Sequence, residues 1–331
     1  MAYRLKADEP VSEGIGRIVA EEIDSATQLL GGASGSKRDE AIHEARKSVK
    51  KIRGVLRLVR PELGKTYKKE NASFRDVGQQ LSELRDAAAL LEVFDQLNKK
   101  FSGAIERKTL GAIKRGLENQ KRETEQRLQP ENVIRETMKT LASAAQRSKT
   151  WPLSKDGFEG VAPGLELSYR EGRKALKKAE QDQNAVSYHD LRKRVKDHWY
   201  HVRLLENLWT DVMQAHETSL KDLETWLGDD HNLAVLREKV EENPENFGDE
   251  SGIQVFLALA AQHQQELRSN SITLAHRVYA DKTRLFVRNL GQLWKAWREQ
   301  PAQPKPAAQP AKHATKQAGR AGGKGSKRNA A

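Results

Sequence analysis

Apolar residues recur every three or four positions along most of the chain, which is the spacing of helices that bury one face. No segment shows the sustained apolar–polar alternation of a strand. Glycine and proline, as at Gly31-Gly32 and Pro130, mark the expected helix ends. The pattern predicts an all-α fold with helices over residues 12–30, 38–59, 66–100, 104–129, 131–148, 165–181, 186–209, 211–241 and within 252–299, and with loops at 150–164 and 242–250.

Two of the predicted helices carry the same basic pattern. The first has His43, Arg46, Lys47, Lys50 and Arg57, and the second has His189, Arg192, Lys193, Lys196 and Arg203, each 146 residues after its counterpart. At about 100° per residue each set covers roughly a third of the helix circumference and spans about 21 Å, opposite an apolar face. Like charges three and four residues apart repel each other. The duplicated cationic face therefore predicts a long anionic ligand.

The same 146-residue offset also relates segments that follow the basic helices. Residues 81–86 align with residues 227–232, and Leu90 aligns with Leu236. Such self-similarity indicates an internal duplication. We expect two helical bundles in tandem, at about residues 10–150 and 160–300, with the two basic helices lining a common groove.

The 331-residue chain has 58 Lys and Arg against 46 Asp and Glu, a formal net charge of +12. Seven of the basic residues lie in 301–331, which contains no acidic residue and almost no large apolar side chain. Such a segment cannot bury enough apolar surface to fold. We predict a folded domain over 1–300 and a disordered basic tail over 301–331, which would add non-specific attraction to polyanions.

The absence of cysteine excludes disulfides, zinc fingers, iron–sulfur clusters and a thiol nucleophile. Near the N-terminus no apolar stretch typical of a signal peptide is present, and residues 253–261 are too short and polar to span a membrane. We expect a cytoplasmic protein that does not enter a membrane.

The chain resembles the CHAD family, named for a conserved histidine α-helical domain. The resemblance rests on His43-x2-Arg46-Lys47-x2-Lys50-Lys51-x-Arg53, on His189-x2-Arg192-Lys193-x2-Lys196, on the Leu-Arg-Asp and Leu-Gly-Asp elements around Arg85 and Gly228, and on Tyr169-Arg170-x-Gly172-Arg173-Lys174, and it covers about residues 3–298. It implies two four-helix bundles about a pseudo-twofold axis. It also implies a basic central cavity or groove that binds inorganic polyphosphate, and association with polyphosphate granules.

The candidate polyphosphate-binding residues combine the two stripes with basic residues near them. They are Arg17, His43, Arg46, Lys47, Lys50, Lys51, Arg53, Arg57, Arg85, Arg170, Arg173, Lys174, His189, Arg192, Lys193, Lys196 and Arg203. In the second half Asp197 stands where Lys51 stands, and Trp199 where Arg53 stands. We therefore expect the second stripe to hold phosphate less tightly. We expect no catalytic residue, metal ligand or cofactor, and the sequence predicts no oligomeric state.

Three other functions fit parts of the pattern. Non-specific nucleic-acid binding would use the tail and the basic helices, although few aromatic residues offer stacking surfaces. Phosphate hydrolysis would need clustered carboxylates, for which only Asp86, Asp229 and Asp230 lie near the motif. A scaffold that binds acidic proteins is the third. His43 and His189 are either charge switches or neutral hydrogen-bond donors.

Overall fold

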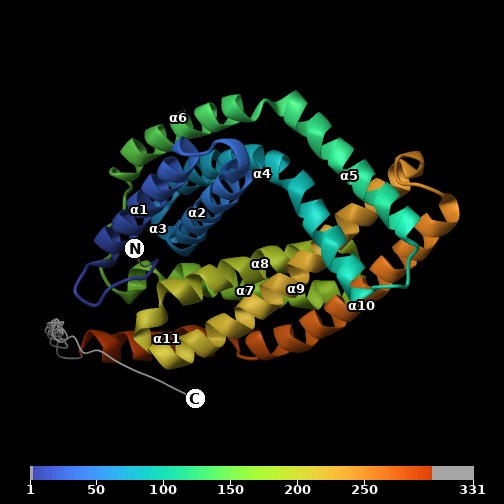
Figure 1. The fold of residues 1–331 in the computed structure, drawn as a ribbon. Helices are drawn as coiled ribbons and strands as arrows, with labels where there is room; N and C mark the ends of the chain where they lie inside the picture. The colour runs from blue at the N-terminus through green and yellow to red at the C-terminus, as the bar shows by residue number, and fades with distance from the viewer. Residues whose placement is uncertain (1–2, 300–331) are drawn as a thin grey trace, which may run out of the picture. The chain divides into compact units, whose positions relative to one another are not determined.

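The computed structural model describes residues 3–299, apart from the side chains of Ser36 and Ala87, and this range contains helices and no strand (Figure 1). The prediction of an all-α fold is confirmed. The predicted tail over 301–331 lies outside the described residues. Within the described range, no helix is both long enough and apolar enough to cross a bilayer.

The helices follow the predicted order. In the first half they are α1 (Val11–Gly31), α2 (Arg38–Leu58), α3 (Arg60–Leu63), α4 (Lys65–Lys100), α5 (Arg107–Leu128) and α6 (Pro130–Ser148). In the second half they are α7 (Ala162–Asp182), α8 (Ala185–Leu204), α9 (Thr210–Glu242), α10 (Glu250–Val278) and α11 (Thr283–Arg298). Short 3-10 turns lie at Gly35–Lys37, Phe158–Gly160, Glu206–Leu208 and Pro244–Asn246. The second basic helix thus ends at Leu204, before the predicted residue 209.

Local sequence fixes the ends of the helices that carry the basic stripes. Asn184 caps α8 by accepting a hydrogen bond from the Ser187 backbone, and the Ser187 hydroxyl interacts with Asn184 in return, forming a capping box. After α2, the short helix α3 ends at Gly64, whose φ of 53° is readily adopted only by glycine. This turn lets α4 pack back against α2.

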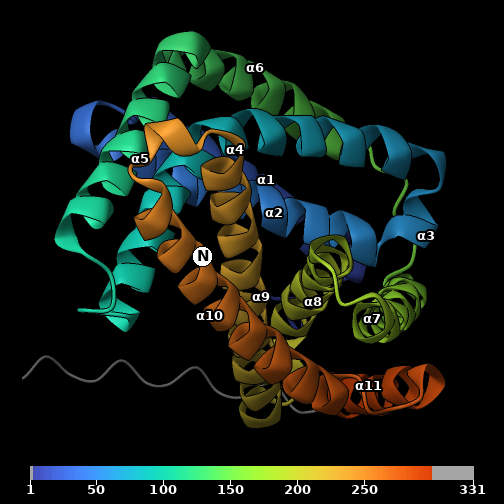
Figure 2. The same ribbon diagram turned by 90° about the vertical axis from the view of Figure 1, so that its right-hand side faces the viewer.

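The hydrophobic cores do not follow the two halves of the sequence. The larger core joins buried residues of the first half, such as Val49 and Ile52, to residues of the second half, such as Leu191 and Val195. A second core lies where α4 and α5 approach α9 and α10 (Figures 1 and 2). Each core thus needs helices from both halves. An origin of the halves by duplication stays a prediction.

The two basic helices cross at a glycine. A Cβ atom added to Gly54 of α2 would lie 2.8 Å from the Cβ atom of Tyr200 on α8, closer than such atoms approach in folded proteins. Beside this contact, His201 Nε2 donates a 3.0 Å hydrogen bond to the Gly54 carbonyl oxygen. The side chain of His201 is buried. The absence of a side chain at Gly54 therefore sets how closely the two cationic faces approach.

Replacing Gly54 with alanine should destabilise the protein. Overpacking typically costs about 1–3 kcal/mol, which exceeds the gain of up to about 1 kcal/mol from helix propensity. Gly16→Ala is the control, because the added Cβ in α1 would meet no atom within 4 Å other than those of its neighbours and its own helix backbone. We expect thermal denaturation to show a lower Tm for Gly54→Ala and an unchanged or higher Tm for Gly16→Ala. Equal stability of the two variants would contradict the close crossing.

Candidate functional site

A basic groove lies between α2 and α8, and we call it the α2/α8 groove. Its lining residues are Lys50, Arg53, Arg57, Arg192, Lys193, Lys196, Asp197 and Tyr200, around a pocket of about 140 Å³. Six of these eight residues are lysine or arginine, and all six are among the predicted site residues. The prediction that the two basic helices line a common groove is confirmed.

Lys50 is a cation of the groove without a counterion in direct contact. Its side chain is partly buried, and among the described residues it forms no hydrogen bond or ion pair. Burial, followed by the positive charges of Lys196, Arg46 and Arg192, holds the Lys50 pKa well below its ordinary value. Both effects disfavour the charged form. A bound anion would relieve both.

Arg46 and Arg192 extend the cationic surface toward α4 and α9. Arg46 donates a 2.7 Å hydrogen bond to the Ser82 hydroxyl and lies 3.6 Å from the Asp86 carboxylate. Arg192 lies over Gly228 of α9, where an added Cβ would be 3.6 Å from Nε of the arginine. In both arginines Nε is buried without a hydrogen-bond partner among the described residues. Buried donors of this kind are uncommon and are stabilised by an added acceptor.

The histidines of the two basic stripes, His43 and His189, have neighbours at equivalent positions in the two halves. Nδ1 of His43 accepts a 3.2 Å hydrogen bond from Arg85 Nε, and the ring of His189 lies 4.3 Å from the ring of His231. Arg85 and His231 are themselves 146 residues apart.

These neighbours also favour the neutral form of both histidines. Burial and adjacent cations lower the pKa of His43 and of His189, and they lower the pKa of His231 to about 4. A ring nitrogen that accepts a hydrogen bond carries no proton. Before an anion binds, the geometry therefore favours neutral histidines.

Asp197 acts on the first stripe and not on the second. Its carboxylate accepts a 2.6 Å hydrogen bond from Arg57 Nη1 of α2, and Arg194 lies 3.8 Å away. Nearby, Arg53 donates a 3.3 Å hydrogen bond to Asn71, and burial lowers the Arg53 pKa to about 10. The aspartate at 197 therefore compensates Arg57 of the first stripe. The weaker hold of the second stripe on phosphate stays a prediction.

Lys47 and Lys193 occupy equivalent, half-exposed positions. Lys47 lies 2.6 Å from Glu44, and Lys193 lies 2.6 Å from Asp190. Exposed ion pairs of this kind contribute less than about 1 kcal/mol and exchange readily. These two lysines can therefore turn toward an anion at little cost.

Two predicted site residues lie outside the groove beside Tyr3. Lys51 forms a 2.7 Å ion pair with Glu22 of α1, and its ammonium lies 5.6 Å from the Tyr3 ring centroid. Arg203 packs on Tyr3 from the other helix and pairs with Glu217 at 3.2 Å. Both cations hold the N-terminal segment against the helices.

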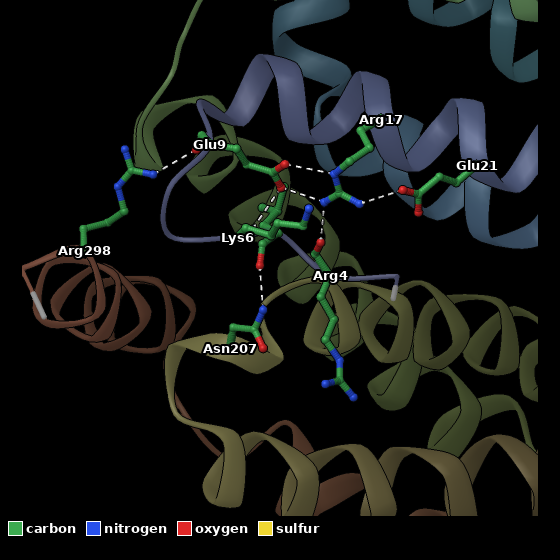
Figure 3. Close-up of polar contacts among 8 residues, drawn as sticks. Arg4, Lys6, Glu9, Arg17, Glu21, Asn207 and Arg298 are labelled. Atoms are coloured by element: carbon green, nitrogen blue, oxygen red, sulfur yellow. Dashed lines mark hydrogen bonds and ion pairs between the residues drawn. The ribbon is translucent and has the colours of Figure 1, made fainter. Parts of the chain in front are cut away.

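Arg17 also serves the N-terminal segment. Its guanidinium donates two hydrogen bonds to Glu9, at 2.9 and 2.7 Å, and a third to the Arg4 carbonyl oxygen (Figure 3). Glu21 completes the network at 3.3 Å. Arg298 reaches the same segment from α11 through the Glu9 carbonyl oxygen. The structure therefore places Arg17 in a structural clamp.

The remaining predicted cations, Arg170, Arg173 and Lys174, are exposed on α7. Arg170 lies 3.5 Å from Glu166 one turn earlier. None of the three lines the α2/α8 groove.

Sequence reasoning missed two residues at the site. Tyr200 lines the groove one turn after Lys196, and this spacing could have indicated it. Glu224 of α9 forms an ion pair with Lys196. It lies 28 residues away along the chain, so no local signal could have indicated this contact.

Comparison with known proteins decides the family. The family model of the CHAD domain matches residues 18–241, more than half of the chain. The chain belongs to the CHAD family.

Solved structures support the CHAD fold. The crystal structure of the CHAD domain from the plant Ricinus communis matches with a TM-score of 0.61 at 17% identity, covering 85% of this chain and 96% of that chain. PptA from Streptomyces chartreusis matches with a TM-score of 0.56 at 11% identity, covering 82% and 100%. No curated protein matches the sequence. At these identities the similarity concerns the fold.

The positive charges clustered around Lys50 should destabilise this CHAD domain. Because folding lowers the Lys50 pKa, the charged side chain destabilises the folded state below that pKa, and the penalty fades as pH rises toward 10.5. We expect Lys50→Met to stabilise the protein at pH 7 by roughly 1 kcal/mol. The control Lys51→Met, which leaves the buried Glu22 without its cation, should destabilise it. Urea denaturation measures both changes, and a stability loss in Lys50→Met would contradict the charge argument.

Proposed function

We propose that this chain binds inorganic polyphosphate in the α2/α8 groove. The observation that carries the proposal is the meeting of six lysine and arginine side chains from two helices in one groove. Like charges that converge in a partly buried site destabilise one another, and a dense linear polyanion removes this repulsion. Family membership supports the same ligand, because resemblance to the CHAD family implies polyphosphate binding.

The chemistry of the groove suits phosphate oxygens. Arginine donates paired hydrogen bonds to phosphate, and lysine contributes a mobile point charge. Arg192 and Lys50 combine both types within the groove, and Arg46 lies close enough to both to affect the electrostatics of the same site. A linear chain that runs across the groove would meet cations of both helices in succession.

We further propose a binding protein and not an enzyme, with granule association through the same contacts. Asp230, one of the few carboxylates near the motif, forms a 2.6 Å ion pair with Arg268. Its backbone carbonyl oxygen accepts a 3.1 Å hydrogen bond from Gln264 Nε2. Asp86 lies beside Arg46. Both carboxylates thus have structural roles that require no catalysis.

Removing two groove charges should abolish most of the affinity. We expect Lys50→Gln/Arg192→Gln in the full chain to bind long-chain polyphosphate at least about tenfold more weakly, since each charge-assisted contact contributes roughly 1.5–3 kcal/mol. Isothermal titration calorimetry at physiological salt measures the loss. The salt dependence of log K for the unaltered chain should have a slope of about −4 if six phosphates are neutralised.

The matched control is Arg170→Gln/Lys174→Gln, which removes the same charge from the exposed face of α7. We expect it to retain the affinity. Equal losses in the two double variants would indicate a generic polyanion surface. Displacement of polyphosphate by duplex DNA at comparable charge concentration would favour the nucleic-acid alternative.

Binding should tighten as pH falls. The free protein holds the pKa of His43 and of His189 below the ordinary 6.5, whereas a bound polyanion raises both, so binding takes up protons. As pH falls, affinity should therefore begin to rise near the pKa values that the two histidines have in the complex. It should level off below the pKa values that they have in the free protein. Titrations at pH 5 to 8 test this, and His43→Gln/His189→Gln should flatten the profile. An equally steep profile in that variant would assign the effect to other groups.

A further inference from the structure

Glu224 gives one half of the groove a counterion that the other half lacks. Its carboxylate on α9 accepts a hydrogen bond from Lys196 Nζ and lies 3.7 Å from Lys221. At the 146-residue offset, Lys196 corresponds to Lys50, and Glu224 corresponds to Gly78 of α4. Lys50 forms no ion pair among the described residues. Of the two central lysines of the groove, only Lys196 therefore has an ion-pair partner, although the charge of Glu224 also acts on Lys50.

The Glu224 carboxylate is held in place as an anion. Only 7% of the residue is exposed. Burial would raise its pKa, but Lys196, followed by Arg192 and Lys221, outweighs burial and lowers the pKa below its ordinary value. The carboxylate thus compensates the same cations that would hold a phosphate group. A phosphate that approaches Lys196 must compete with an anion that is already bound.

We infer that Glu224 is a specificity-determining residue that makes the groove bind long polyphosphate in preference to short phosphates. This inference rests on the proposed function. A short phosphate must find all its contacts near Lys50, Arg192 and Lys196, where Glu224 repels it. A long chain can also reach Arg53 and Arg57, which line the groove on α2. It can then leave the Lys196–Glu224 ion pair intact.

The test compares two ligands on the full chain. We expect Glu224→Gln to raise the affinity for sodium triphosphate about tenfold, which is the contribution of one charge-assisted contact. The affinity for long-chain polyphosphate should rise less than about threefold. Isothermal titration calorimetry measures both affinities, and thermal denaturation confirms that the variant is folded.

Glu22→Gln is the matched control. Glu22 is also a buried glutamate, 8% exposed, in an ion pair with a lysine at 2.7 Å, but its partner Lys51 lies outside the groove. The Glu22→Gln variant changes the net charge by the same amount as Glu224→Gln and should leave both affinities unchanged. An equal gain in triphosphate affinity from Glu22→Gln would overturn the assignment and indicate a general charge effect.

The reciprocal variant Gly78→Glu keeps the inference testable if Glu224→Gln does not fold. The added Cβ would meet only Val49 Cγ1, at 3.5 Å, an ordinary contact. We expect it to weaken triphosphate binding more than long-chain binding. If the unaltered protein binds long polyphosphate and both variants keep its preference for long chains, the role of Glu224 is refuted and the proposed function stands. Failure of the unaltered protein to bind long polyphosphate would refute the proposed function and the inference with it.

Discussion

The close crossing of α2 and α8 at Gly54 is the constraint on which the site depends. Without a side chain at this position, the backbone of α2 packs directly against Tyr200, and His201 donates a buried hydrogen bond to the Gly54 carbonyl oxygen. The apolar faces of both helices, including Val49 and Val195, are buried in one core. Burial of apolar surface therefore holds two cationic faces together although their charges repel. Burial, followed by the repulsion of neighbouring cations, lowers the pKa of Lys50. The fold thus holds a local concentration of positive charge that an anion can stabilise.

Acidic residues divide that charge unequally between the halves. Asp197 reaches across the crossing to Arg57, so the second half supplies a counterion to the first. Glu224 compensates Lys196 within the second half, whereas Lys50 has no equivalent acid because Gly78 stands in that place. Removing one member of a partly buried ion pair costs more stability than the pair contributes, because it leaves the other charge unpaired. The fold therefore keeps these ion pairs. The groove therefore combines Lys50, which has no ion-pair partner, with Lys196, which is paired to Glu224, although both lysines occupy the same position of the repeated basic pattern.

Sequence periodicity predicted the helices and the direction of their faces, because burial of residues such as Ile52 and Leu191 imposes a regular spacing. It also placed the basic residues opposite the core and predicted that the stripes meet. It could not predict what each cation contacts, because a helical wheel gives an angle and not the element that packs there. Arg17 and Lys51 were therefore predicted as groove residues, but Arg17 pairs with the N-terminal segment and Lys51 pairs with α1. The sequence division into halves also did not reveal that both cores combine helices of the two halves.

The aromatic residues near the groove argue for a ligand without bases. Single-stranded nucleic acids gain affinity when their bases stack on exposed aromatic rings. Here Tyr200 packs against Gly54 and stacks on Trp199, with ring centroids 5.2 Å apart. Arg203 and Lys221 lie over the Trp199 ring, at 5.1 and 5.0 Å from its centroid. A base that stacked on either ring would have to displace these contacts. A ligand that offers only phosphate oxygens leaves them in place and gains from the charge of both helices, and this difference is why we propose polyphosphate in preference to nucleic acid.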